Sequence, residues 1–342
     1  MARSQAELDR WIEGSEEEIL DPGLPIVDAH HHMWVRPPEK YGFEEVLADA
    51  MRGHNVRATV FMECTAMYKP DGPEPLRSVG ETEYVNGVAA MSYSGILGPR
   101  GICAGIVSAT DFRYGDEVAT VLEAHIRAGG GRFRGMRQQS QHDEHIGSLA
   151  RRAPPPGLLL DAKFRRGFAC LAPLGLTFDA YLYHTQLGEL ADLAAAFPGT
   201  GIVLDHAGTP LGIGPYAGRR DEVYAAWAES MRALARHDNV SVKIGGLGMP
   251  HLGFGFDARE RPPSSAEMAA AWRPYVEFCI EAFGPDRCMF ESNFPVDKQS
   301  GGYVALWNAF KRITASYATV EKSALYWTTA CRVYRLDEAS FA

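Results

Sequence analysis

The sequence lacks closely spaced cysteines. Its six cysteines are scattered, most of them within apolar stretches, and none belongs to a Cys-x-x-Cys pair. A disulfide framework and a structural zinc knot both need cysteines at short, regular separations, so this pattern excludes them. We therefore expect reduced, buried thiols.

Positive charge is also scarce. The chain has 34 lysine and arginine residues against 43 aspartate and glutamate residues, and its net charge is -9. Surfaces for nucleic acid or acidic membranes need concentrated positive charge, so neither partner is expected. No apolar run reaches membrane-spanning length, and residues 2–13 lack the apolar core of a signal peptide. We expect a cytoplasmic protein.

The motifs of several enzyme classes are missing. The sequence has no G-x-x-x-x-G-K-[ST] loop, no G-x-G-x-x-G opening a helix, no G-x-S-x-G elbow and no H-E-x-x-H helix. Their absence argues against a P-loop phosphate site, a dinucleotide site, a serine nucleophile on an elbow and a helical zinc site.

A run of three histidines, His30 to His32, follows the apolar segment 25–27, which is typical of a strand. Residues two apart on a strand project to the same side, so His30 and His32 face one way and His31 the other. Two neutral imidazoles at a strand end can share one divalent cation. The alternative is a polar strand end or a tag-like tract, but a tag would lie at a terminus without an apolar strand before it.

Short apolar segments alternate with helical patterns from Pro25 onward. The first of the eight predicted strands starts at residue 25. The other seven cover 57–64, 101–107, 133–137, 176–181, 201–205, 240–244 and 287–291. Helical patterns include 43–51, 118–126, 187–196, 222–234 and a last helix over 322–335. This alternation predicts an α/β fold, a (β/α)8 TIM barrel with long βα loops.

We expect one barrel domain over residues 25–342 and an N-terminal extension over residues 1–24. In the extension, Leu8, Trp11 and Ile12 are expected to dock on the barrel, while Glu16 to Glu18 stay in solvent. The connections 66–80, 138–158, 208–220 and 248–265 are rich in proline, glycine and charge, and we expect them to form lids.

Polar residues follow nearly every predicted strand, at the end where a barrel gathers its functional groups. They are His30, His32, Glu63, Arg137, Gln138, Asp179, Tyr183, His184, Asp205, His206, Lys243, Glu291 and Asn293. A barrel without a site would have no reason to collect them there.

Five segments resemble successive blocks of the amidohydrolase superfamily. They are 27–34, 133–137, 204–210, 243–249 and 290–297. The similarity is to the branch with sugar-acid lactonases and a pyrone-dicarboxylate lactonase, whose neighbours include metal-dependent decarboxylases of aromatic acids. It covers about residues 25–336, block by block and in order.

The resemblance implies that His30, His32 and His206 form the site and hold a divalent metal, with Zn2+ the expected ion. Some lactonases of this branch work without metal. The family has an aspartate where this chain has Asn293. Because an amide cannot act as a general base, we expect Glu63 or Glu291 to take that role, with Asp297 the weaker candidate.

The remaining candidates have two interpretations each. Arg137, Tyr183 and Lys243 could anchor an acid, since a guanidinium binds a carboxylate bidentately, but Arg137 and Lys243 could also form internal ion pairs. His184 could bind a metal, as in the decarboxylases, or this segment could place Tyr183 and Gln186 on the substrate. His206 could be a core histidine bonded to Asp205. The other histidines read as surface or packing residues; they are His54, His125, His142, His145, His237 and His251.

The sequence thus predicts a hydrolase that opens a lactone, or a related ester or amide, of a small organic acid. A non-oxidative decarboxylase on the same scaffold and a catalytically silent ligand-binding barrel are the alternatives. The expected partner is a small molecule. The oligomeric state stays open, a homo-oligomer included.

Overall fold

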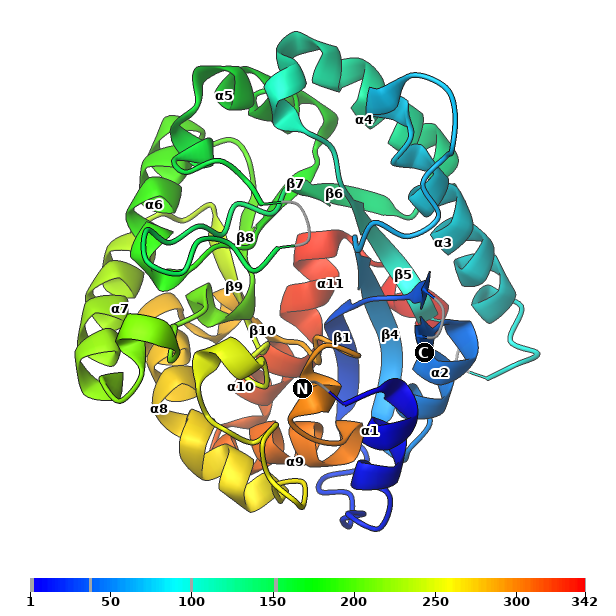
Figure 1. The fold of residues 1–342 in the computed structure, drawn as a ribbon. Coiled ribbons are helices and arrows are strands. Elements are labelled where there is room, and N and C mark those ends of the chain that lie inside the picture. The colour runs from blue at the N-terminus through cyan, green and yellow to red at the C-terminus, as the bar shows by residue number, and fades with distance from the viewer. Residues whose placement is uncertain (1–2, 37–38, 99–100, 151–152, 342) are drawn as a thin grey trace.

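Eight parallel strands form the central sheet, in an order that follows the chain (Figure 1). The computed structural model describes residues 3–36, 39–98, 101–150 and 153–341. The strands are β1 (Pro25–His31), β4 (Asn55–Met62), β5 (Gly101–Ser108), β6 (Phe133–Arg137), β7 (Thr177–Ala180), β8 (Ile202–Leu204), β9 (Val240–Ile244) and β10 (Cys288–Phe290). This confirms the predicted (β/α)8 barrel. A short hairpin, β2 (Trp34–Arg36) with β3 (Glu39–Tyr41), follows β1 and was not predicted.

Helices surround the sheet (Figure 1). They are α2 (Phe43–Ala50), α3 (Val79–Tyr93), α4 (Val118–Ala128), α5 (Ala162–Phe168), α6 (Leu187–Ala196), α7 (Arg220–Leu234), α8 (Ser265–Phe283) and α9 (Tyr303–Ile313). The four helices predicted before the last one are confirmed: they correspond to α2, α4, α6 and α7. The predicted last helix over 322–335 is confirmed as a continuous helical segment, which runs from α10 (Thr319–Ser323) through a π-helical turn, Ala324–Thr328, into α11 (Thr329–Tyr334). Among the described residues, no helix is both long and apolar enough to cross a bilayer.

The barrel closes between β1 and the segment after β10. The amide of Asn293 donates to the carbonyl of His30 at 2.9 Å, and the amide of His32 donates to the carbonyl of Phe294 at 2.8 Å. The Asp28 carboxylate accepts the Ser292 amide at 2.8 Å. These bonds fix the histidines of β1 against the segment that carries Asn293.

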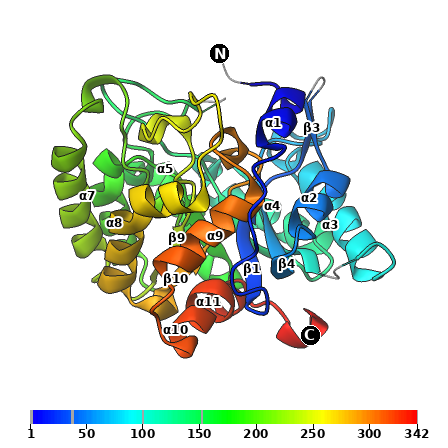
Figure 2. The ribbon, with the colours of Figure 1, turned by 90° about the horizontal axis from the view of Figure 1, so that it is seen from below.

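Helix α11 covers the amino-terminal end of the barrel. An apolar cluster joins Val27 and Ala29 of β1 to Cys331 and Tyr334 of α11. Figure 2 shows α10 and α11 at one end of the barrel and α1 (Gln5–Ile12) with the long loops at the other. This apolar cluster lies at the amino-terminal end of the barrel, so the carboxyl ends of the strands are left for polar groups.

An irregular register in β1 between Asp28 and His31 directs the histidines. His31 bonds the Thr59 hydroxyl at 2.8 Å, on the outer side of the sheet, whereas His30 and His32 contact each other inside it. The prediction that His31 faces away is confirmed. Such irregularities often re-aim side chains beside active sites.

The segment before β1 packs on the barrel. Leu8 and Ile12 are buried, and the Trp11 indole donates to the Glu260 carbonyl at 3.0 Å. The expectation that residues 16–18 stay in solvent was wrong for Glu17, which accepts the Ser265 amide at 2.6 Å. All six cysteines are free, and five of them are buried.

Candidate functional site

A cavity of about 710 Å³ opens at the carboxyl ends of the strands. Five residues predicted for the site line it: His32, Glu63, Arg137, His206 and Asn293. The cavity wall does not include Tyr183, His184 or Lys243. Its size suits a small organic molecule.

His32 and His206 line this cavity, whereas His30 is not part of its wall and lies against both of them; all three are buried. Nε2 of His30 lies 3.2 Å from Nε2 of His32, and the rings of His30 and His206 have centroids 4.6 Å apart. His206 has a positive φ of 56°, an uncommon conformation for a non-glycine residue that turns its side chain toward β1.

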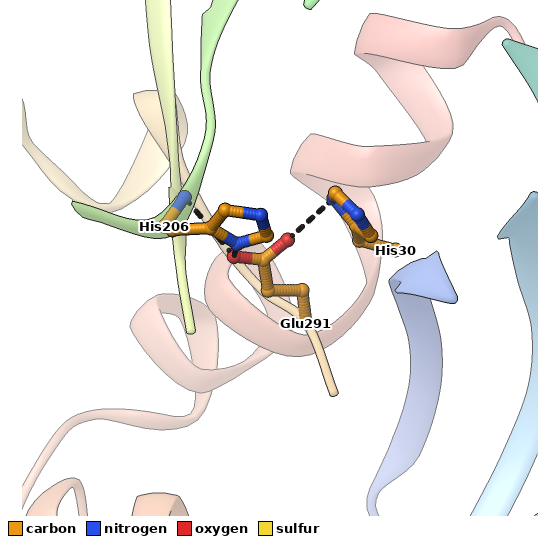
Figure 3. Close-up of side chains that lie close together, drawn as sticks. All are labelled: His30, His206 and Glu291. Carbon is orange, nitrogen blue, oxygen red and sulfur yellow. Dashed lines mark hydrogen bonds and ion pairs between the residues drawn. The ribbon is translucent and has the colours of Figure 1, made fainter. Parts of the chain in front are cut away.

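Glu291 lies between His30 and His206 and bridges them (Figure 3). Its Oε1 accepts a hydrogen bond from Nδ1 of His206 at 2.8 Å, and its Oε2 lies 2.9 Å from Nδ1 of His30. The second contact is close but not aligned as a hydrogen bond. His206 is therefore oriented by Glu291 and not by Asp205, the partner that the sequence suggested.

The outer nitrogens of these histidines are occupied. Nδ1 of His32 donates to the Met62 carbonyl at 2.9 Å, while Nδ1 of His30 and of His206 face Glu291. A carboxylate at Nδ1 favours the proton there, which leaves the lone pair on Nε2. The Lys243 ammonium, which can only donate, lies 3.4 Å from Nδ1 of His30 and favours the opposite tautomer, but the Glu291 carboxylate is nearer, at 2.9 Å. Arg137 Nη1, which can only donate, lies 3.4 Å from Nε2 of His30 and requires the tautomer that Glu291 favours.

This arrangement fits a divalent metal. Histidine ligands to metals usually donate their other ring nitrogen to a carboxylate or a backbone carbonyl, as His32 and His206 do, and Nδ1 of His30 faces Glu291 at 2.9 Å. Two imidazole nitrogens on one tetrahedral zinc ion lie about 3.3 Å apart, close to the separation of the His30 and His32 Nε2 atoms. His30, His206 and Glu291 also offer one ligand atom each within 4.8 Å of the others. Because Glu291 already accepts Nδ1 of His206, we assign it the orienting role.

Burial keeps the histidines neutral. It lowers the pKa of His30 to about 4 and that of His206 to about 3, and it places the pKa of His32 well below its ordinary value. Neutral imidazoles are the form that binds metal. A histidine with so low a pKa is a weak general base, so the proton acceptor must be sought elsewhere.

Buried charges around the histidines are unbalanced. The carboxylates are Glu63, Asp179, Asp205 and Glu291, and the cations are Arg137 and Lys243, all of them buried. These acids outnumber the bases, and a divalent cation would offset part of the excess negative charge.

Arg137 is already engaged. Its Nε lies 2.9 Å from Glu63 Oε1, and its Nη2 donates to the Glu63 carbonyl at 2.7 Å. Gln139 donates to the same carboxylate oxygen at 3.2 Å. Arg137 therefore fixes Glu63 in the cavity wall, and the ion-pair interpretation of Arg137 describes its geometry.

Lys243 forms internal ion pairs with two buried carboxylates. Its Nζ lies 2.7 Å from Asp179 Oδ1 and 3.2 Å from Asp205 Oδ1, with all three side chains fully buried. Although burial alone would lower it, the carboxylates raise the pKa of Lys243. The expectation that Lys243 anchors a substrate acid fails on position, because its ammonium lies inside the barrel, below the cavity wall.

Tyr183 and His184 also lie elsewhere. The Tyr183 hydroxyl accepts the Leu149 amide at 3.1 Å, and Nδ1 of His184 accepts the Leu211 amide at 3.3 Å. Tyr181 lines the cavity instead, with its ring edge-on to His206 at 5.1 Å. His251, taken from the sequence for a surface or packing residue, lines the cavity beside Tyr181. The alternation of polar and apolar residues in the sequence did not indicate that Tyr181 or His251 would line the cavity.

Asn293 pairs with a carboxyl group. Its Nδ2 donates to Asp297 Oδ1 at 2.8 Å, and Asp297 Oδ2 accepts the Gly248 amide at 2.8 Å. Burial raises the pKa of Asp297 well above its ordinary value. Asn293 thus contacts both the cavity and a buried acid.

Comparison with known proteins identifies the family. The amidohydrolase family model matches residues 27–336, which is most of the chain. The chain belongs to the amidohydrolase family. This confirms the resemblance in the sequence blocks.

Two relatives show how far the similarity of this amidohydrolase extends. The uncharacterized protein y4mH of Sinorhizobium fredii is 33% identical over 335 residues, which are 92% of this chain and 99% of that protein. The L-fucono-1,5-lactonase of Burkholderia multivorans is 29% identical over 214 residues, which are 62% of this chain and 66% of that enzyme. The family and these relatives support an enzyme of the hydrolase type.

Solved structures agree on the fold. An amidohydrolase of Burkholderia multivorans with bound zinc has a TM-score of 0.71 at 24% identity, covering 91% of this chain and 99% of its own. A 5-carboxyvanillate decarboxylase of Novosphingobium aromaticivorans, complexed with manganese, has a TM-score of 0.58 at 12% identity, with coverage of 92% and 97%. At these identities the likeness concerns the barrel alone.

Proposed function

We propose that this chain hydrolyses the lactone ring, or a related ester or amide bond, of a small organic acid. The observation that carries the proposal is the arrangement of His30, His32 and His206: Nδ1 of His32 and of His206 is hydrogen-bonded, Nδ1 of His30 faces Glu291, and the Nε2 atoms of His30 and His32 lie 3.2 Å apart. The similarity to L-fucono-1,5-lactonase supports lactone chemistry.

Nε2 of His30, His32 and His206 would hold a divalent ion, with Zn2+ the expected metal. Bound there, such an ion polarises a carbonyl and lowers the pKa of a water to about 7. Glu291 keeps two of the imidazoles oriented. The low pKa of His30 and His206 keeps them neutral for this task.

Glu63 would take the proton from the attacking water. It lines the cavity, whereas Glu291 lies beneath the histidines and is absent from the cavity wall. Arg137 holds Glu63 Oε1, so the proton goes to Oε2. The water oxygen then bonds the carbonyl carbon, the ring C–O bond breaks, and Glu63 returns the proton to the alkoxide that leaves.

Product analysis tests this proposal. The purified protein is incubated with a panel of aldonolactones and pyrone-type lactones, and ring opening is followed by proton release at constant pH. A ring-opened acid supports hydrolysis, and loss of that activity in His206→Ala ties it to the site. Release of CO2 from an aromatic acid, without ring opening, would replace the proposal by the decarboxylase alternative.

Elemental analysis separates the remaining interpretations. Near-stoichiometric metal that is lost in His30→Ala supports the metal site. A metal-free protein with lactonase activity would mean that the histidines hold the water and the substrate carbonyl directly. A metal-free, inactive protein would support a silent ligand-binding barrel.

A further inference from the structure

The arginines of the cavity wall differ in the groups that already hold them. The wall includes Arg36, Arg77, Arg113 and Arg137. Arg137 pairs with Glu63 at 2.9 Å, and Arg113 pairs with Asp111 at 2.6 Å. Among the carboxylates that the structure describes, none lies within 4.0 Å of Arg36 or Arg77.

Arg36 is the better placed of the two. Arg77 is exposed, whereas Arg36 is half-buried at the end of β2, shortly after β1. His32, Trp34 and Arg36 alternate along the segment 32–36, and all three line the cavity. Alternate residues of an extended chain project to one side, so this segment presents a histidine, an indole and a guanidinium in a row.

Contacts between neighbours hold this row together. The Arg36 guanidinium lies 4.9 Å from the centre of the Trp34 ring, and the Trp34 ring lies 6.0 Å from that of His32. Nη2 of Arg36 donates to the Cys64 carbonyl, which is a neutral partner. The guanidinium is therefore positioned while its charge stays uncompensated.

We propose that Arg36 binds a carboxylate of the ligand and that Trp34 supports the part of the ligand between this carboxylate and the histidines. The inference rests on the proposed function and names the residue that recognises its acid group. A half-buried guanidinium with free donors binds a carboxylate through two parallel hydrogen bonds. In a chain with a net charge of -9, an unpaired cation in a cavity selects for an anion.

With Arg36 in this role, the positive charge that an incoming acid needs does not have to come from Arg137 or Lys243. Both cations are consumed by buried carboxylates, so neither can neutralise an incoming acid. Arg36 supplies that charge from the wall near β4, on the same segment as His32.

Calorimetric titration tests the proposal without turnover. Succinate and benzoate are titrated into the metal-loaded wild type and into Arg36→Gln, Arg36→Lys and Arg127→Gln. Arg127 is an exposed arginine on α4, so its substitution controls for net charge. We expect Arg36→Gln to weaken binding of at least one acid by about tenfold or more, Arg36→Lys to weaken it less, and Arg127→Gln to leave it unchanged.

The outcomes separate this inference from the proposed function. Binding that depends on Arg36 supports the carboxylate site even where no lactone is opened. Lactonase activity combined with unchanged acid binding in a folded Arg36→Gln variant overturns the carboxylate site alone. Failure of the wild type to bind either acid at millimolar concentration also overturns it.

Discussion

Glu291 accepts Nδ1 of His206 at 2.8 Å, and the two side chains are both buried. The bond fixes the imidazole so that its other nitrogen is left for a ligand. By the resemblance of the sequence blocks, the aspartate expected from the family would lie two positions later, where this chain has Asn293. In this chain the carboxylate stands at the end of β10 and acts on the histidines from beneath.

Replacing Glu291 by glutamine tests the orienting role. The amide can accept from only one of its two atoms, so one of the two histidines loses its anchor. We expect metal affinity, measured by competition with a chromophoric chelator, to fall about 10–100-fold. Glu189→Gln, on α6 outside the cavity wall, is the matched control. Unchanged affinity in Glu291→Gln would contradict the orienting role.

Lys243→Met should damage stability more than substrate binding. The variant leaves Asp179 buried without its cation and leaves Asp205 with Arg137 alone, which costs about 3–5 kcal/mol in the free energy of unfolding. Denaturant titration measures the loss, and adding Asp179→Asn should recover part of it. A Lys243→Met protein of normal stability with a raised KM would restore the substrate-anchoring interpretation.

The fold and half of the site could be predicted because their signals are local. Alternating apolar segments gave the strands, and a period of two put His30 and His32 on one side. The pattern failed where the chain leaves a strand: β7 ends at Ala180, and beyond it the choice between Tyr181 and Tyr183 depends on loop geometry. Lys243 was misplaced because depth within a barrel is not encoded in strand periodicity.

Asn293→Asp should not restore a family-like site. The new carboxylate would face Asp297, now 2.8 Å from the Asn293 amide nitrogen, and one of the two acids must stay protonated. Burial already raises the pKa of Asp297. An acid whose pKa is raised in the folded protein contributes its full stabilisation of the fold at pH values below its unfolded-state pKa, near 4. That contribution is lost as the pH rises through the folded-state pKa.

We therefore expect Asn293→Asp to lower the melting temperature at pH 7 and to approach the wild type near pH 4. Activity near neutral pH should fall as well. The double variant Asn293→Asp with Asp297→Asn should recover stability at pH 7. Tighter metal binding and faster turnover in the single variant would contradict this expectation.

Glu81 should produce a second pH dependence, remote from the histidines. It accepts the amides of Cys64 at 3.1 Å and Ala66 at 2.7 Å, which hold the loop beside Glu63. Burial, then the charge of Glu63, raises the pKa of Glu81 to about 8. The protonated acid stabilises below about pH 4.5, and this contribution is lost as pH rises through 8.

Glu81→Gln keeps an acceptor for the amides and removes the titration. We expect the melting temperature of the variant to exceed that of the wild type increasingly between pH 5 and 9. Glu83→Gln, an exposed neighbour on α3, should follow the wild type. Parallel curves for the wild type and Glu81→Gln would contradict a buried acid with a raised pKa.

The division of labour between the two glutamates is tested most directly by measuring metal content and lactone ring opening together in Glu63→Gln. Glu63 lines the cavity and contacts none of the three histidines through a hydrogen bond, so the variant should retain its metal. Its turnover should fall at least about 100-fold across neutral pH, because the proton acceptor is gone. Full turnover in Glu63→Gln, with metal bound, would contradict the account.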